Sequence, residues 1–163
     1  TDERRRFAQL SHEYLIEQVQ FTGHEQVDKG KAVKMSFNHP VKELIWRVNS
    51  SNGNTYKTVD SAKLMLNGND RFSQRDGTYF TLVQPYQHHT NIPPTDEGVH
   101  VYSFALKPEE HQPSGTLNMS RIDTASLQID NTSGALGDVM KLYAVNYNVL
   151  RILSGMGGLA YSN

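Results

Sequence analysis

The chain of 163 residues contains no cysteine, and this absence removes two classes of structure. Without thiols it can form neither a disulfide framework nor a thiolate metal site, and it is compatible with a reducing compartment. It also lacks any apolar run near the roughly 18 residues of a membrane span, and no signal-peptide pattern opens the sequence. These absences predict a soluble, intracellular protein with no membrane insertion.

A surplus of charge is missing as well, since the formal net charge is -1. A surface that binds nucleic acid directly needs Lys and Arg concentrated on one side. The one dense basic run is Arg4-Arg5-Arg6. It could contact an acidic partner, but a solvated leader before the first strand is the simpler interpretation. We therefore expect no direct contact with nucleic acid. The chain also begins at Thr1 without Met, which suggests a fragment or a processed piece.

Alternation of apolar and polar residues dominates the rest of the chain. Between Tyr143 and Val149 large apolar residues alternate with small or polar ones, which predicts a half-buried strand over 140–153. From Leu150 to Leu153 apolar residues occur on both faces, so we expect the strand to be covered on both sides there. Seven shorter strands are predicted at 13–22 (after a possible turn of helix), 32–37, 41–48, 57–67, 99–106, 116–122 and 124–130. The strand at 99–106 is expected to be buried and central.

These eight strands are separated by turn residues, of which Asn52-Gly53 is the strongest hairpin signal. Such a pattern with little helix is typical of a two-sheet antiparallel sandwich. Eight strands with one long insertion predict an all-β jelly roll, and residues 1–163 form a single domain. The only Trp, Trp46, is expected in the core.

The long insertion at about 67–98 interrupts the strand pattern. Loops of this length usually have internal structure. Tyr79, Leu82, Val83 and Tyr86 have helical spacing, and Pro85 would stop a helix near Gln84. We predict a short helix that packs on the sandwich through these four side chains.

We interpret none of the candidate patterns in the sequence as a catalytic or metal-binding site. Gly155 to Ala160 satisfies the dinucleotide pattern G-x-G-x-x-A, but no helix follows to bind the pyrophosphate, so a flexible tail is the simpler interpretation. Adjacent His88 and His89 would point to opposite faces of an extended segment, whereas a strand-borne metal pair needs i, i+2 spacing. Glu109-Glu110 lies on a Pro-flanked loop without a fixed separation for glycoside hydrolysis. We expect no catalytic residue, cofactor or metal, and no enzyme.

Two further patterns stay open. Asn49, Asn118 and Asn131 begin N-x-[ST] glycosylation acceptors, which matter only if the chain meets the secretory pathway. Arg121 and Asp123 stand at i, i+2, so on a strand they would share one face as an intersubunit ion pair or an internal register lock.

Several strings of the sequence resemble one protein family, the major capsid proteins of nucleocytoplasmic large DNA viruses of the iridovirus and phycodnavirus type. They cover essentially the whole chain in order, and are Phe7 with Ser11 to Gln18, Phe37 to Trp46, Gln84 to Thr90, Tyr102 to Thr116, Asn118 to Asp123, Tyr143 to Ile152 and Ser154 to Asn163. The family pattern often has Cys before the Asn of the Asn118 motif and Phe after it, where this chain has Leu117 and Met119. Both residues are apolar, so we expect the packing of this motif to be preserved.

The resemblance implies a structural protein of the virion. The subunit of this family is two jelly rolls in tandem, and the chain is similar to the second, C-terminal roll. The family forms homotrimers, which build pseudo-hexagonal capsomers of an icosahedral shell around an internal membrane and a double-stranded DNA genome. The implied partners are copies of the chain, neighbouring capsomers and minor capsid proteins, and the implied place of assembly is the host cytoplasm, late in infection. The first roll is not part of this sequence, so the resemblance does not imply that this chain forms trimers by itself.

A carbohydrate-binding sandwich is the alternative function, since jelly rolls also serve lectins. A metal enzyme of the cupin type is a third. Saccharide binding would require exposed aromatic residues beside Asn or Asp on one concave patch.

Overall fold

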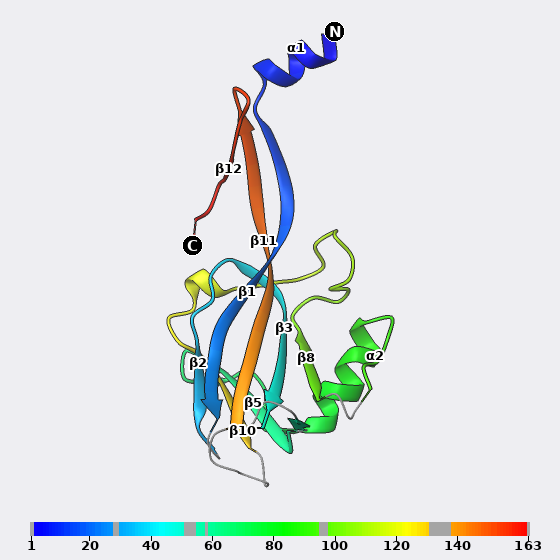
Figure 1. The fold of residues 1–163 in the computed structure, drawn as a ribbon, viewed down its shortest axis with the longest axis vertical. Helices are drawn as coiled ribbons and strands as arrows, with labels where there is room; N and C mark the ends of the chain where they lie inside the picture. The colour runs from blue at the N-terminus through cyan, green and yellow to red at the C-terminus, as the bar shows by residue number, and fades with distance from the viewer. Residues whose placement is uncertain are drawn as a thin grey trace.

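Two antiparallel sheets make up the computed structural model, which describes residues 2–27, 30–50, 55–57, 59–94, 98–130 and 138–162 (Figure 1). The first sheet has the strand order β1 (His12–Val27), β11 (Asp138–Leu153), β3 (Pro40–Asn49), β8 (Val99–Ser103). Two short strands, β4 (Tyr56–Lys57) and β9 (Leu117–Asn118), also pair with β3, and β12 (Met156–Leu159) pairs with β11. The second sheet has the order β2 (Ala32–Met35), β10 (Ala125–Asp130), β5 (Ser61–Leu66), with β6 (Asn69–Asp70) and β7 (Arg75–Asp76) on β5.

The predicted all-β jelly-roll sandwich is confirmed. Among the described strands, β4, β6, β7 and β9 contain two residues each, and the other eight contain four or more. The helices are short, and none that the structure describes is long and apolar enough to cross a membrane.

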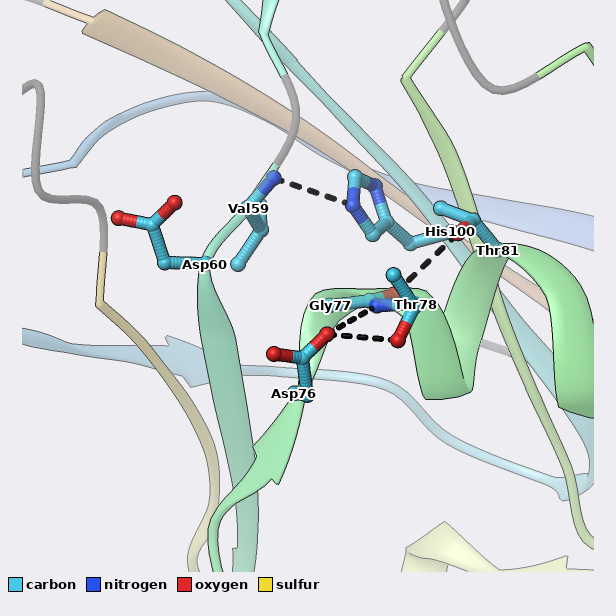
Figure 2. Close-up of a pocket in the computed structure, with 7 residues that line it drawn as sticks. All are labelled: Val59, Asp60, Asp76, Gly77, Thr78, Thr81 and His100. Carbon is cyan, nitrogen blue, oxygen red and sulfur yellow. Dashed lines mark hydrogen bonds between the residues drawn. The ribbon is translucent and has the colours of Figure 1, made fainter.

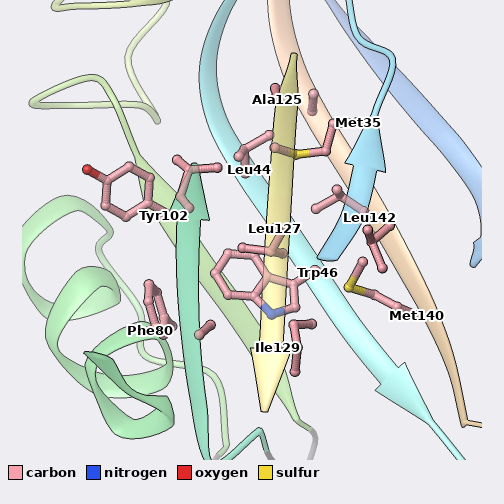
Figure 3. Close-up of a cluster of buried hydrophobic side chains, with 14 of the residues drawn as sticks. Met35, Leu44, Trp46, Phe80, Tyr102, Ala125, Leu127, Ile129, Met140 and Leu142 are labelled. Carbon is pink, nitrogen blue, oxygen red and sulfur yellow. The ribbon is translucent and has the colours of Figure 1, made fainter. Parts of the chain in front are cut away.

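The core lies between the two sheets, where every second residue of a strand points inward. On β10, Ala125, Leu127 and Ile129 are buried, as their alternation with polar residues predicts. Trp46 and Leu142 come from paired positions of β3 and β11 and are almost completely buried (Figure 3). The prediction that the only Trp lies in the core is therefore confirmed.

The long strand β11 is half-buried as predicted, but the buried face is not the one with the larger apolar residues. Met140, Leu142, Ala144 and Asn146 are completely buried, whereas Tyr143 is on the opposite, partly exposed face. The cross-strand partner of Ala144 is Leu44, also completely buried, so a small residue fits where the core is already filled.

A narrow ribbon projects from the sandwich and carries both ends of the chain (Figure 1). We call it the stem and define it as α1 (Asp2–Gln9), residues 12–16, residues 148–153 and β12. The prediction that Leu150 to Leu153 is covered on both faces is wrong, because Leu153 is 53% exposed. The reason is the length of β3, whose pairing with β11 ends at Asn146, so no sandwich exists beyond that point.

The glycine-rich end is part of the stem rather than a flexible tail. Ser154 and Gly155 have φ of 52° and 77°, the backbone of a tight two-residue hairpin turn. This turn reverses the chain into β12, which pairs with β11 from Leu150↔Leu159 to Leu153↔Met156.

Three other predicted strands differ from the structure. The strand at 57–67 is two strands in different sheets, β4 and β5. The strand at 116–122 is only β9, followed by a 3-10 helix at Met119–Arg121. The strand at 99–106 is buried over β8, but its only described sheet partner is β3, so it is not central. The predicted hairpin at Asn52-Gly53 lies outside the described residues.

Candidate functional site

The insertion at 67–98 contains the predicted helical segment, but with a different buried side. A π-helix, η1 (Tyr79–Val83), runs directly into an α-helix, α2 (Gln84–His88). Pro85 does not stop the helix, because it stands in the first turn of α2, a position that Pro commonly occupies. The wider π-helical turn changes which residues share a face.

As a result, three of the four side chains predicted to pack on the sandwich point to solvent. Leu82 and Val83 are each 39% exposed and Tyr86 is 78% exposed, whereas only Tyr79 packs against the core. Together with Ile92 these three form a shallow apolar hollow of about 340 Å³, which we call the helix patch.

Residues between these positions hold the insertion on the first sheet. Phe80 is completely buried, and its ring lies 5.1 Å from that of Trp46. Gln84 is also buried, and its side chain accepts a hydrogen bond from the backbone N–H of Ser103 and donates one to the hydroxyl of Tyr79. The helix patch is therefore presented by a well-anchored segment.

A second apolar surface lies on the outer face of the first sheet. The register of β1 and β11 pairs Leu15 with Val149, Val19 with Val145 and Phe21 with Tyr143, so all six side chains share one face. Leu15, Val19 and Phe21 are 39%, 64% and 46% exposed. We call these six residues the outer-face patch. The Glu17↔Tyr147 pair interrupts this face, so the largest unbroken apolar part is Val19, Phe21 and their two partners on β11. Exposed apolar surface of this kind marks an interaction site.

A partly buried ion pair crosses the sheet where Glu17 interrupts the outer-face patch. Lys42 Nζ lies 2.8 Å from Glu17 Oε1, and the Lys42 side chain is only 3% exposed. The same Lys42 nitrogen stands 5.2 Å from the ring centre of Tyr147. Although burial alone would raise it, the hydrogen bonds and charges of Lys42 and His111 hold the pKa of Glu17 below its ordinary value.

Replacing Lys42 with Met should destabilise the fold by about 1–3 kcal/mol, because Glu17 would lose its partner. The cost should stay below that of a fully buried pair, since the Glu17 side chain is 34% exposed and water reaches it. Urea denaturation followed by circular dichroism measures the effect. Lys107→Met is the matched control, because the Lys107–Glu110 pair is exposed and should contribute less than about 1 kcal/mol. Equal effects of the two variants would contradict the assignment.

A hollow of about 270 Å³ lies between the two residues that precede β5, the start of the helical segment and β8 (Figure 2). His100 is completely buried at its wall, and burial lowers its pKa to about 4, so the ring is neutral. Its Nε2 atom accepts a hydrogen bond from Val59 N, and Asp76 Oδ1 accepts two from Thr78. These groups serve the backbone and a turn, and they do not form an acid and base pair.

The histidines and glutamates singled out in the sequence have structural partners. His88 Nδ1 lies 2.9 Å from the carbonyl oxygen of Leu106, and His89 lies between Glu43 and Glu109. Glu110 instead pairs with Lys107. Among the described residues no group of three or more His, Asp or Glu side chains is placed to hold a metal ion. Sequence reasoning missed Glu43, because nothing local indicates that β3 and the end of α2 meet.

The glycosylation acceptors and the Arg121/Asp123 pair are the remaining patterns from the sequence. Asn49 is half-buried at the end of β3, and Asn118 accepts a hydrogen bond from Ser120 N that caps the 3-10 helix. Asn131 lies outside the described residues. The prediction that Arg121 and Asp123 share a strand face is wrong, because Arg121 ends the 3-10 helix.

Proteins of known sequence and structure match this chain over its whole length. A family model described as large eukaryotic DNA virus major capsid protein matches residues 3–158. The chain is 57% identical to the major capsid protein of Pyramimonas orientalis virus and 43% identical to that of Paramecium bursaria Chlorella virus 1, covering all of this chain and 46% and 52% of those proteins. A quasi-atomic model of the PBCV-1 virus capsid superposes with a TM-score of 0.85 at 39% identity, over 99% of this chain and 54% of that one. The chain thus spans about half the length of the relatives it matches.

Proposed function

We propose, from the premise that the chain belongs to the large eukaryotic DNA virus major capsid protein family, that it is one sandwich unit of a shell-forming subunit. The family is structural, and the work of such a protein is shape repeated by symmetry rather than a reaction. Since relatives are about twice as long, we infer that this unit is the second of two jelly rolls in the complete subunit.

The outer-face patch is the observation that carries this proposal. A sandwich that functions alone would not expose Val19 and Phe21 on the face of a sheet, since large apolar patches on monomers mark interaction sites. The stem adds exposed Leu153, Met156 and Leu159 beyond the body of the sandwich. We propose that the other jelly roll and neighbouring subunits cover these surfaces, first in a homotrimer and then between capsomers and minor capsid proteins.

This role places the protein in the capsid of the virion, and we propose that assembly takes place in the host cytoplasm. Cryo-electron microscopy of the complete protein or of native particles tests the proposal. Hexagonally packed trimers with two jelly rolls per subunit would support it, whereas a monodisperse monomer in assembly conditions would contradict it.

A charge placed in the outer-face patch should prevent assembly without unfolding the sandwich. We expect Val19→Lys in the complete protein to reduce the assembled fraction at least about tenfold, because an unpaired charge would have to be buried. Native mass spectrometry measures the assembled fraction, and thermal unfolding should shift little because Val19 is 64% exposed. Ser36→Lys is the control, since Ser36 is exposed and lies outside the patch. Assembly of Val19→Lys at the level of the control would argue against the patch as an interface.

The alternative of carbohydrate binding has less support. Tyr86 is the most exposed aromatic ring, but its neighbours in the helix patch are Leu82, Val83 and Ile92. A saccharide site would need carboxylate or amide groups at that position to bind hydroxyls. A glycan array tests the alternative directly.

A further inference from the structure

The loop that follows β8 is fastened to the rest of the molecule in two different ways. Its base is held by backbone groups, because Phe104 N and Ala105 N donate to Lys42 O, and Leu106 N donates to Ser114 O. Pro108 is buried and belongs to the base of the loop. The tip, residues 109–113, reaches over the first sheet toward the end of α2. It is held there by the side chains of Glu109 and His111 and by the Tyr147 hydroxyl on β11, which donates to the His111 carbonyl oxygen.

His89, at the end of α2, joins the tip to the sheet. Its Nδ1 atom lies 3.2 Å from Glu109 Oε1 on the loop, and its Nε2 atom lies 2.9 Å from Glu43 Oε2 on β3. The second contact is short but not directed as a hydrogen bond, and neither Nε2 nor Oε2 has another hydrogen-bond partner. This contact therefore depends on the charge of the ring.

The chemistry of imidazole makes the arrangement sensitive to protonation. A neutral ring has one N–H and one lone pair, so it can turn an N–H toward only one of two carboxylates, whereas an imidazolium carries a positive charge and an N–H on each side. If the ring is neutral, the attraction between its charge and Glu109 is lost, and Glu109 is held mainly by the N–H and hydroxyl of Thr90, so this contact opens more often. Glu43, whose side chain is 9% exposed, would then be left beside a ring with no positive charge.

The other charged groups nearby face elsewhere or belong to the same set. Lys42 is turned to Glu17, Lys107 to Glu110, and the His88 ring to a backbone carbonyl. His111 on the tip forms a second contact of the same kind, with its Nδ1 atom 3.2 Å from Glu17 Oε1. That ring is 63% exposed, so the contact is screened by water and contributes less.

We propose that His89 is a proton-controlled latch, which fastens the Glu109 side of the tip of the 104–116 loop to the first sheet while its ring is protonated and loosens it when the ring loses its proton. The His111 side stays held by the Tyr147 hydroxyl in both states.

The pKa shifts of His89 and Glu109 are consistent with these contacts. The close contact with the Glu43 carboxylate, assisted by Glu109, raises the pKa of His89 above its ordinary value against the effect of burial. The pKa of Glu109 is lowered, first by the two hydrogen bonds from Thr90 and then by His89. A raised pKa means that the latch stabilises the fold fully below about pH 6.5 and that this contribution is lost as the pH rises through the pKa of His89 in the folded protein.

Amide hydrogen exchange by NMR tests the latch. The reporters are Thr90, whose N–H donates to Glu109, and Glu110, whose N–H donates to Lys107 O. Between about pH 5.5 and about pH 8.5 we expect their protection factors to fall about tenfold, with the midpoint at which the His89 ring protons titrate. Protection that stays constant over this range, or that changes with a different midpoint, would overturn the proposal.

Two variants separate His89 from its neighbours. In His89→Gln the two amides should show low protection at every pH, whereas the control His88→Gln should keep the pH dependence, since that ring faces no carboxylate in the described structure. A full pH dependence in His89→Gln would transfer the effect to His111 and overturn the assignment. If His89→Gln fails to fold, Glu109→Gln is the substitute, because Glu109 is on the exposed tip and its loss should lower the titration midpoint of His89.

Discussion

Replacing Gly77 with Ala is expected to destabilise the fold by about 3 kcal/mol or more, at or above the upper end of the usual cost of overpacking. A Cβ atom at this position would lie 1.7 Å from the carbonyl oxygen of Val59 and 2.8 Å from its carbonyl carbon. Both atoms belong to the backbone, so a change of side-chain rotamer cannot relieve the clash. The chain would have to separate here, which breaks the hydrogen bond from Gly77 N to Asp60 O and shifts the start of the helical segment.

Urea denaturation followed by far-ultraviolet circular dichroism measures this effect. Gly158→Ala is the matched control, because a Cβ there meets no atom within 4 Å. We expect the control to change the free energy of unfolding by less than about 0.5 kcal/mol. A Gly77→Ala variant within about 1 kcal/mol of the parent would show that the close approach of the two segments is not required for stability.

Truncating Leu142 to Ala should cost about 2–5 kcal/mol. Its side chain is completely buried between the sheets, and its cross-strand partner is Trp46, so the substitution leaves a cavity beside the largest core residue. Because Trp46 is the only Trp in the chain, its fluorescence reports on the same site. We expect a lower urea midpoint together with a red-shifted emission if water enters the cavity.

Leu153→Ala is the control for this substitution, because Leu153 belongs to the same strand but is 53% exposed on the stem. It should cost less than about 1 kcal/mol in this chain. A similar loss from both substitutions would mean that the stem packs as tightly as the core, in conflict with the position of the sandwich along β11.

Local patterns predicted most of the strands because side chains alternate across a strand wherever its two faces meet different surroundings. The alternation of Ala125, Leu127 and Ile129 identified β10 within one residue, and that of 143–149 identified the long strand β11. The prediction was wrong where tertiary contacts replaced local preference. Met119 to Arg121 forms a 3-10 turn capped by Asn118, and the single strand predicted at 57–67 divides between two sheets.

The helical insertion shows the limit of periodicity most clearly. Tyr79, Leu82, Val83 and Tyr86 predict an amphipathic α-helix, and a helix is present over these residues. A π-helical turn is not readable from apolar spacing, because it is stabilised by the contacts of Phe80 with Trp46 and of Gln84 with Ser103. The side chains assigned to the core therefore form the exposed helix patch.

By itself the sequence determined the composition of the molecule, its β character, its approximate strands and the family that its strings resemble, since these depend on residues close together in the chain. The tertiary structure decided which face of β11 is buried, that its end leaves the sandwich as a stem, and that His89 meets Glu43 and Glu109. An alternating strand only indicates that its two faces differ. Which face becomes the interior depends on where the second sheet packs and where β3 ends, and these are contacts between residues far apart in the chain.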